Sequence, residues 1–101
     1  MIVVGGIKVP PQPLEQRMRD LPGVRDAVML VVPGPLGADR LHVVLETDQA
    51  VIAPAVRVGI ATIIAPYYGG DIVIDRLDLP RTEHGKVRRA DVRAMLLDRR
   101  S

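Results

Sequence analysis

The spacing of apolar residues changes several times along the chain, and each change predicts an element of secondary structure. Residues 2–9 place two short, mainly β-branched segments around Gly5-Gly6, a pattern typical of a small β-hairpin. A proline-rich stretch follows and leads into a predicted amphipathic helix, whose apolar face holds Leu14, Met18 and Leu21. Pro22-Gly23 then ends this helix.

The second part of the chain predicts two further strands, a long helix, a last strand and a final helix. Residues 24–32 contain a nearly unbroken apolar run, typical of a central strand, and residues 41–46 alternate as in a half-exposed strand. The remaining elements are a helix over 53–65, a strand over 72–79 that ends at Pro80, and a helix over 89–98. The order ββαββαβα predicts an α+β fold for a single domain over residues 1–101. We expect a small two-layer domain, in which an N-terminal hairpin accompanies a roughly three-stranded sheet packed by three helices.

The helix predicted over residues 53–65 is apolar nearly all round, with Arg57 as its one charged residue. Such a helix cannot bury every side against the sheet of a 101-residue domain. Either part of the segment is irregular, or it offers an apolar surface for another domain, another subunit or a second copy of the chain.

Composition excludes several classes of function. The chain has no Cys, so we expect no disulfide, no thiol nucleophile and no thiolate metal site. Its two histidines, His42 and His84, have no evident ligand cluster around them, and we expect no metal site. A net charge of +2 and two tyrosines as the only aromatic residues argue against nucleic-acid binding, which ranks as the weakest reading. The sequence shows no membrane span or leader, so we expect a cytoplasmic protein.

Lys86 lies on a short polar segment between the last predicted strand and the last predicted helix. A loop held at both ends can present a single ammonium group at a fixed place while leaving it accessible to a carboxylate or a phosphate. Most lysines on loops are simply solvated, and residue types alone favour that second reading.

Three motifs together resemble the small C-terminal domain of the adenylate-forming enzymes, the superfamily of acyl- and aryl-CoA synthetases. The first motif is Val4-Gly5-Gly6-Ile7-Lys8-Val9-Pro10-Pro11 with Leu14-Glu15 after it, and the second is Leu21-Pro22-Gly23-Val24 followed by Asp26-Ala27-Val28. The third is Leu79-Pro80-Arg81-Thr82, then Gly85-Lys86-Val87 and Arg89, which is similar to the family's terminal glycine-lysine motif. The motifs span nearly the whole chain in the family's order.

The resemblance implies roles for particular residues. In the family, a carboxylate and ATP form an acyl-adenylate, and a thiol then displaces AMP. Lys86 would be the catalytic lysine of the first step, offsetting the repulsion between carboxylate and phosphate. The Gly5-Gly6 hairpin would replace it in the second step and line the channel for the pantetheine arm of CoA or of an acyl carrier protein. Lys8, Gly85 and Arg89 complete the substrate- and cofactor-binding residues that the resemblance implies.

The resemblance also has departures. His84 stands where the family usually has Ser or Thr, and Tyr68-Gly69-Gly70-Asp71 replaces a stretch that usually contains proline. We expect the family's large N-terminal domain and its hinge residue to lie outside these 101 residues. That domain would bind ATP, Mg²⁺ and the acid, so we expect this chain to be inactive without it, whether the two are joined in one polypeptide or associate as separate chains. The alternative is a stand-alone interaction or regulatory module that retains the fold without catalysis.

Overall fold

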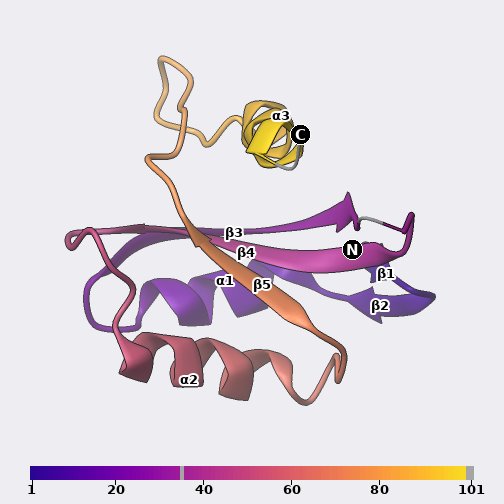
Figure 1. The fold of residues 1–101 in the computed structure, drawn as a ribbon. Helices are drawn as coiled ribbons and strands as arrows, with labels where there is room; N and C mark the ends of the chain where they lie inside the picture. The colour runs from indigo at the N-terminus through magenta and orange to yellow at the C-terminus, as the bar shows by residue number, and fades with distance from the viewer. Residues whose placement is uncertain (35, 100–101) are drawn as a thin grey trace.

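A computed structural model describes residues 1–34 and 36–99 (Figure 1). The elements follow the predicted order ββαββαβα, which confirms the predicted α+β class. They are β1 (Ile2–Val4), β2 (Ile7–Val9), α1 (Pro11–Arg19), β3 (Val24–Pro33), β4 (Asp39–Thr47), α2 (Pro54–Ile64), β5 (Ile72–Arg76) and α3 (Arg89–Arg99).

The three longer strands form one sheet with the order β3-β4-β5. β3 and β4 pair antiparallel, whereas β4 and β5 pair parallel, with Leu41 opposite Ile72 and Leu45 opposite Arg76. A parallel pair needs a crossover, and α2 provides it between β4 and β5. The hairpin β1-β2 forms a separate two-stranded sheet.

The last strand is shorter than predicted. The sequence predicts a strand over 72–79, but β5 ends at Arg76. Leu77 still donates a backbone hydrogen bond to Leu45 at 3.0 Å, and Leu79 then donates to the Glu46 carboxylate at 2.9 Å. The chain therefore leaves the sheet before Pro80, because the Leu79 N–H donates to a side-chain carboxylate and not to the carbonyl of a neighbouring strand.

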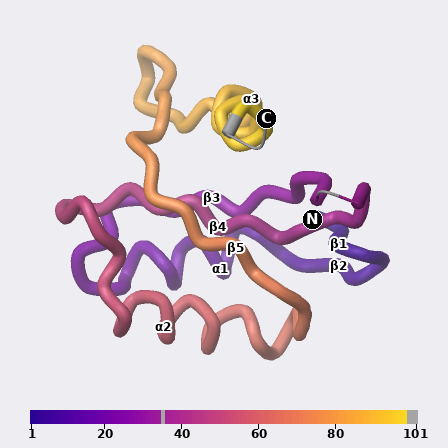
Figure 2. Tube along the Cα trace, in the orientation of Figure 1, coloured from indigo at the N-terminus to yellow at the C-terminus, as the bar shows by residue number. Residues whose placement is uncertain are grey.

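Each face of the sheet covers its own hydrophobic cluster. Alternate residues of β3 and β4, among them Met29 and Leu45, pack with α1, α2 and the hairpin on one face. On the other face Val28, Val32 and Val44 pack with residues of α3 and the segment before it, Leu79, Val92 and Leu96. Figure 1 shows α1 and α2 on one side of the sheet and α3 on the other, and the Cα trace in Figure 2 follows the chain as it rises from β5 and turns back into α3.

α2 is buried on one face and exposed on the other, despite its apolar composition. Its inner face buries large side chains: Val56, Ile60, Ile63 and Ile64. Its outer face carries mostly small or polar residues, and Val58, 66% exposed, is the large apolar side chain there. Self-association through residues 53–65 stays a prediction that would rest mainly on Val58. Within residues 1–34 and 36–99, the helices are too short or too polar to cross a bilayer.

Candidate functional site

Lys86 lies in a tight turn that the backbone closes by itself. Thr82 donates to the Lys86 carbonyl at 2.8 Å, and Gly85 donates to the Thr82 carbonyl at 3.0 Å. Gly85 has φ of 83°, a left-handed conformation that favours glycine. Outside the turn, the Arg88 backbone donates to the Pro80 carbonyl at 2.8 Å. This bond closes the base of the segment 80–88, which we call the Lys86 loop. The residue before Lys86 and the base of its loop are thus fixed by local bonds.

Arg81 joins this loop to the sheet. Its guanidinium contacts Asp26 on β3 at 3.0 Å through Nη1 and Glu46 on β4 at 2.9 Å through Nη2. Asp26 and Glu46 are direct cross-strand partners, and two like charges in this arrangement repel each other. The guanidinium bridges them and removes that repulsion. Arg19 at the end of α1 adds a second ion pair to Asp26 at 2.8 Å.

These contacts keep both carboxyl groups ionised. Burial opposes ionisation of Asp26, but hydrogen bonds from Arg19, the Ala27 backbone and Arg81 outweigh it and lower the pKa of Asp26. Burial likewise opposes ionisation of Glu46, and the Leu79 backbone together with Arg81 lowers its pKa. The hydrogen bond to Glu46 is the main reason that the pKa of Arg81 rises. The cluster is therefore fully charged at neutral pH.

Arg89, at the start of α3, forms a bidentate ion pair with Glu15 of α1, with distances of 2.9 and 2.8 Å. Glu15 is 1% exposed and also accepts a hydrogen bond from the Met29 backbone at 2.7 Å. The hydrogen bond to Glu15 raises the pKa of Arg89 above its usual value. Arg89 therefore ties α1 and β3 to the end of the Lys86 loop, while its predicted contact with a ligand stays a prediction.

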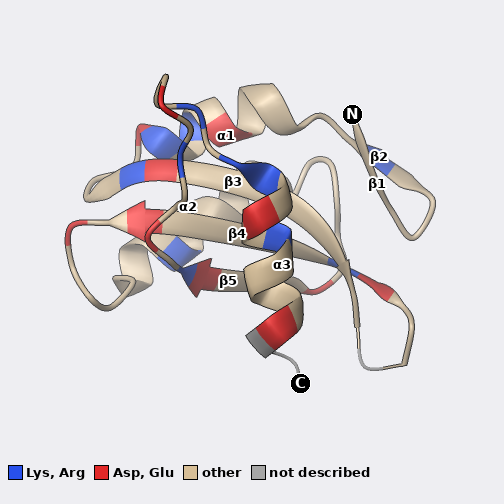
Figure 3. Ribbon diagram, turned by 90° about the horizontal axis from the view of Figure 1, so that it is seen from above, with Lys and Arg blue, Asp and Glu red and all other residues tan. Residues whose placement is uncertain are grey.

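Lys86 differs from the arginines beside it. Arg19, Arg81, Lys86 and Arg89 all border one open cleft of about 350 Å³, together with Asp26 and the loop backbone. The three arginines are held in ion pairs, whereas Lys86 is exposed and its ammonium has no ion pair or hydrogen bond to any residue that the structure describes. Seen from above the sheet, charged segments of the loop, of α1 and of β3 gather at this corner of the molecule (Figure 3).

The glycine hairpin lies at the other end of the molecule from the Lys86 loop (Figures 1 and 3). Gly5 and Gly6 have φ of 54° and 84°, and a Cβ atom added to either would meet nothing within 4 Å. Lys8 is exposed and pairs with Val3 across the two strands. The structure thus brings Lys86, Gly85 and Arg89 together at one site and leaves Gly5, Gly6 and Lys8 at a second.

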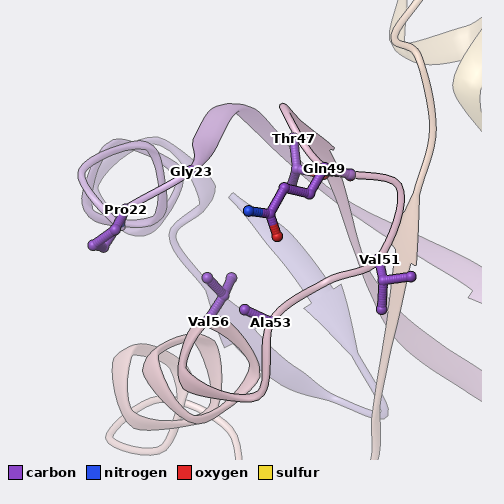
Figure 4. A pocket seen from close by; sticks show the side chains of 7 residues that line it. All are labelled: Pro22, Gly23, Thr47, Gln49, Val51, Ala53 and Val56. Atoms are coloured by element: carbon purple, nitrogen blue, oxygen red, sulfur yellow. Dashed lines mark hydrogen bonds between the residues drawn. The ribbon is translucent and has the colours of Figure 1, made fainter.

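A separate hollow of about 210 Å³ opens between the end of α1 and the start of α2 (Figure 4). Its lining is mainly apolar and contains no charged side chain: Pro22, Gly23, Thr47, Gln49, Val51, Ala53 and Val56. The Gln49 amide points into it (Figure 4). This hollow offers no group for acid–base or phosphate chemistry, so the Lys86 cleft is the better candidate site.

The two histidines take different positions. His42 is buried at 8% exposure, and its Nδ1 lies 3.3 Å from the Asp75 carboxylate on β5, so it contacts a neighbouring strand. His84 is exposed at the tip of the Lys86 loop. No group of three or more metal-ligating side chains gathers anywhere in residues 1–34 and 36–99.

The sequence did not identify the carboxylates of the site. Glu15 and Asp26 stand inside two of the motifs, and their partners Arg89 and Arg81 stand inside the third, so the ion pairs connect all three motifs. The signal available in the sequence was that the three motifs contain acidic and basic residues to which no partner had been assigned. Glu46 and Arg19 lie outside the motifs and carried no such signal.

No protein-family model and no curated protein matches the sequence. Solved structures do match the fold. Mycobacterium tuberculosis fatty acyl CoA synthetase matches with 24% identity and a TM-score of 0.74, over 94% of this chain and 19% of that protein. MatB from Rhodopseudomonas palustris matches with 26% identity and a TM-score of 0.72, over 93% of this chain and 19% of MatB. The anthranilate CoA ligase AuaEII, solved in complex with anthranoyl-AMP, matches with 22% identity and a TM-score of 0.68, over 94% of this chain and 19% of the ligase.

These matches define the class of domain. The chain has the fold of the small C-terminal domain of the acyl- and aryl-CoA synthetases, as the three motifs imply. It spans 19% of the length of each of these three proteins.

Proposed function

We propose that this chain is the lysine-bearing domain of an ATP-dependent ligase that adenylates a carboxylic acid and transfers the acyl group to a thiol. Lys86 serves the adenylation step, and the Gly5-Gly6 hairpin serves the thioester step. A large adenylation domain, in the same polypeptide or in a separate one, binds ATP, Mg²⁺ and the acid. The thiol belongs to CoA or to the pantetheine arm of a carrier protein, and the reaction takes place in the cytoplasm.

The observation that carries this proposal is the difference in pairing between Lys86 and its neighbouring arginines. Arg81 and Arg89 are held by carboxylates, whereas the Lys86 ammonium has no such partner among the described residues. An exposed cation on a loop that is closed by its own backbone hydrogen bonds can enter a site on another domain without first breaking an ion pair. There it offsets the repulsion between the carboxylate and the α-phosphate as they approach.

The chemistry of the ammonium suits this role. It is a compact point charge on a flexible stem, whereas a guanidinium is wide and planar. The chain contains two lysines, Lys8 and Lys86, against twelve arginines, and the two lysines lie in the two segments that the proposal uses. The separation of these segments on the molecule supports an enzyme in which the domain turns between steps and presents one segment at a time.

The residues of the hairpin fit a slender ligand. A Cβ atom at Gly5 or Gly6 would project into open space, so glycine leaves the backbone bare there. Lys8 on the adjacent strand is exposed and can meet an anionic part of the thiol substrate. Gly85 sets the turn that presents Lys86, and Arg89 lines the same cleft as the lysine.

The test is a Lys86→Ala substitution in the enzyme formed by this chain and its large domain. ATP–pyrophosphate exchange is measured over a panel of fatty, dicarboxylic and aromatic acids. We expect the exchange rate to fall by about 10²–10³-fold, because a fixed charge at the transition state is lost. Thioester formation from preformed acyl-adenylate should change far less, since that step does not use Lys86.

Arg88→Gln is the matched control. Arg88 is an exposed cation of the same loop, and its one ion pair among the described residues is with Asp91, three residues later, so its loss should leave exchange unchanged. An exchange rate that survives Lys86→Ala, in a complex shown to be assembled, would rule out the catalytic role and favour the stand-alone interaction module.

A further inference from the structure

Asp26 and Glu46 form a socket for a cation on the face of the sheet that supports the Lys86 loop. They are cross-strand partners, and their side chains are 13% and 16% exposed. Two carboxylates this close and this shielded need a shared cation, and the Arg81 guanidinium meets both. Asp26 and Glu46 are themselves fixed by backbone donors, Ala27 at 2.8 Å and Leu79 at 2.9 Å.

The same guanidinium reaches the residue before the lysine. Arg81 Nη1 donates to the Gly85 carbonyl at 3.3 Å, in addition to its contact with Asp26. Arg81 also lies opposite Val87, the residue after Lys86, in an isolated antiparallel bridge. A path of direct contacts therefore runs from two sheet strands through one side chain to the peptide that carries Lys86.

Little else fixes the outer part of the loop. Every residue from Arg81 to Lys86 is exposed, and Val87 is the nearest one that packs against the hydrophobic cluster under α3. The local hydrogen bonds close the turn but do not set its direction relative to the sheet. Arg81 is the side chain between Leu79 and Val87 that connects the loop to the sheet strands by ion pairs.

We propose that Arg81, seated between Asp26 and Glu46, is a positioning residue that sets the direction of the Lys86 loop for adenylation. This inference rests on the proposed function of Lys86 and adds a residue that acts through it. A displacement of about 1 Å at a reacting centre can cost on the order of 10²-fold in rate, so a loop free to swing would lose most of the benefit of the lysine.

The first test uses the chain by itself. ¹⁵N relaxation is measured for residues 82–88 in the unmodified chain and in the Arg81→Gln and Arg88→Gln variants. We expect order parameters of about 0.85 in the unmodified chain and in Arg88→Gln, and below about 0.6 in Arg81→Gln. If Arg81→Gln does not fold, Glu46→Gln replaces it in this test, because it removes one of the two carboxylates that hold Arg81. Unchanged order parameters in a folded variant would overturn the positioning role.

The second test separates positioning from stability and uses the enzyme with its large domain. Arg81→Gln should lower pyrophosphate exchange by about 10–10²-fold and leave thioester formation from acyl-adenylate unchanged. Combined with Lys86→Ala it should lower exchange by less than about twofold further, because Arg81 acts only through Lys86. Arg81→Lys, which keeps the charge but cannot span both carboxylates, should give an intermediate rate.

The outcomes distinguish the two proposals. If Lys86→Ala has no effect on exchange, the proposed function fails. If Lys86→Ala abolishes exchange but Arg81→Gln does not lower it, or lowers it equally in both backgrounds, the positioning role fails while the function stands.

Discussion

The Glu15–Arg89 ion pair is asymmetric, because its two side chains differ in burial. Glu15 is 1% exposed, whereas Arg89 is 45% exposed and can be hydrated if it loses its partner. Arg89→Gln would leave a buried carboxylate without its cation, and such a change costs about 3–5 kcal/mol. Glu15→Gln keeps an acceptor for the Met29 backbone and leaves a solvated cation, so we expect about 1–2 kcal/mol. Urea unfolding of both variants measures the difference.

The exposed Arg88–Asp91 pair provides the control for this comparison. Arg88→Gln should change the free energy of unfolding by less than about 1 kcal/mol, because exposed ion pairs contribute little. Equal losses for Glu15→Gln and Arg89→Gln would contradict the asymmetry. Glu15 and Arg89 are 74 residues apart in the sequence, so local patterns could not pair them. The sequence predicted Arg89 as a binding residue because the motif includes it. Its contact with Glu15 depends on where α1 and α3, which lie on opposite faces of the sheet, sit relative to β3.

The contact between α1 and α2 depends on a glycine in the middle of a helix. A Cβ atom at Gly59 would lie 2.8 Å from a methyl carbon of Leu21, the residue shortly after α1. The end of the Leu21 side chain can shift to admit a single methyl group, but a Gly59→Leu substitution adds a branched side chain to the same contact. It should destabilise the protein by about 1–3 kcal/mol through overpacking, despite the better helix propensity of leucine. Thermal unfolding measures the loss.

Ala61→Leu is the matched control, since Ala61 lies on the exposed side of the same helix and should tolerate the change. Leu21→Ala should restore part of the stability of Gly59→Leu by making room for the new side chain. A Gly59→Leu variant as stable as Ala61→Leu would show that the helices do not pack closely at this point.

The elements themselves were largely predictable, because hydrophobic periodicity and turn residues are local signals. The hairpin, the three helices and the antiparallel strands all lie within a few residues of their predicted positions. The end of β5 was not predictable, since it depends on the Glu46 carboxylate accepting the Leu79 backbone donor from another strand. The composition of α2 also did not predict that one face of the helix is exposed, because the alanine and threonine residues on that face count as apolar or neutral.

The molecule as a whole should lose stability in acid through its charged cluster at the Lys86 cleft. Asp26 and Glu46 have pKa values below their ordinary values in the folded protein. Burial opposes their ionisation, but Arg19, the Ala27 backbone and Arg81 outweigh it at Asp26, and the Leu79 backbone and Arg81 outweigh it at Glu46. Between the folded and the unfolded pKa, the unfolded chain binds more protons than the folded one. The stabilising contribution is therefore complete above about pH 5 and is lost as the pH falls through the folded values.

Arg81 lowers both pKa values, so its replacement should flatten this dependence. We expect the free energy of unfolding to fall between pH 6 and pH 3 by less in Arg81→Gln than in the unmodified chain, as measured by urea titration at each pH. Arg88→Gln should retain the full slope, because Arg88 contacts neither carboxylate. Parallel curves for the unmodified chain and Arg81→Gln would mean that Arg19 and the backbone donors alone hold Asp26 and Glu46 ionised. Because the same guanidinium is proposed to direct the Lys86 loop, the acid titration and the relaxation measurement probe one contact by independent means.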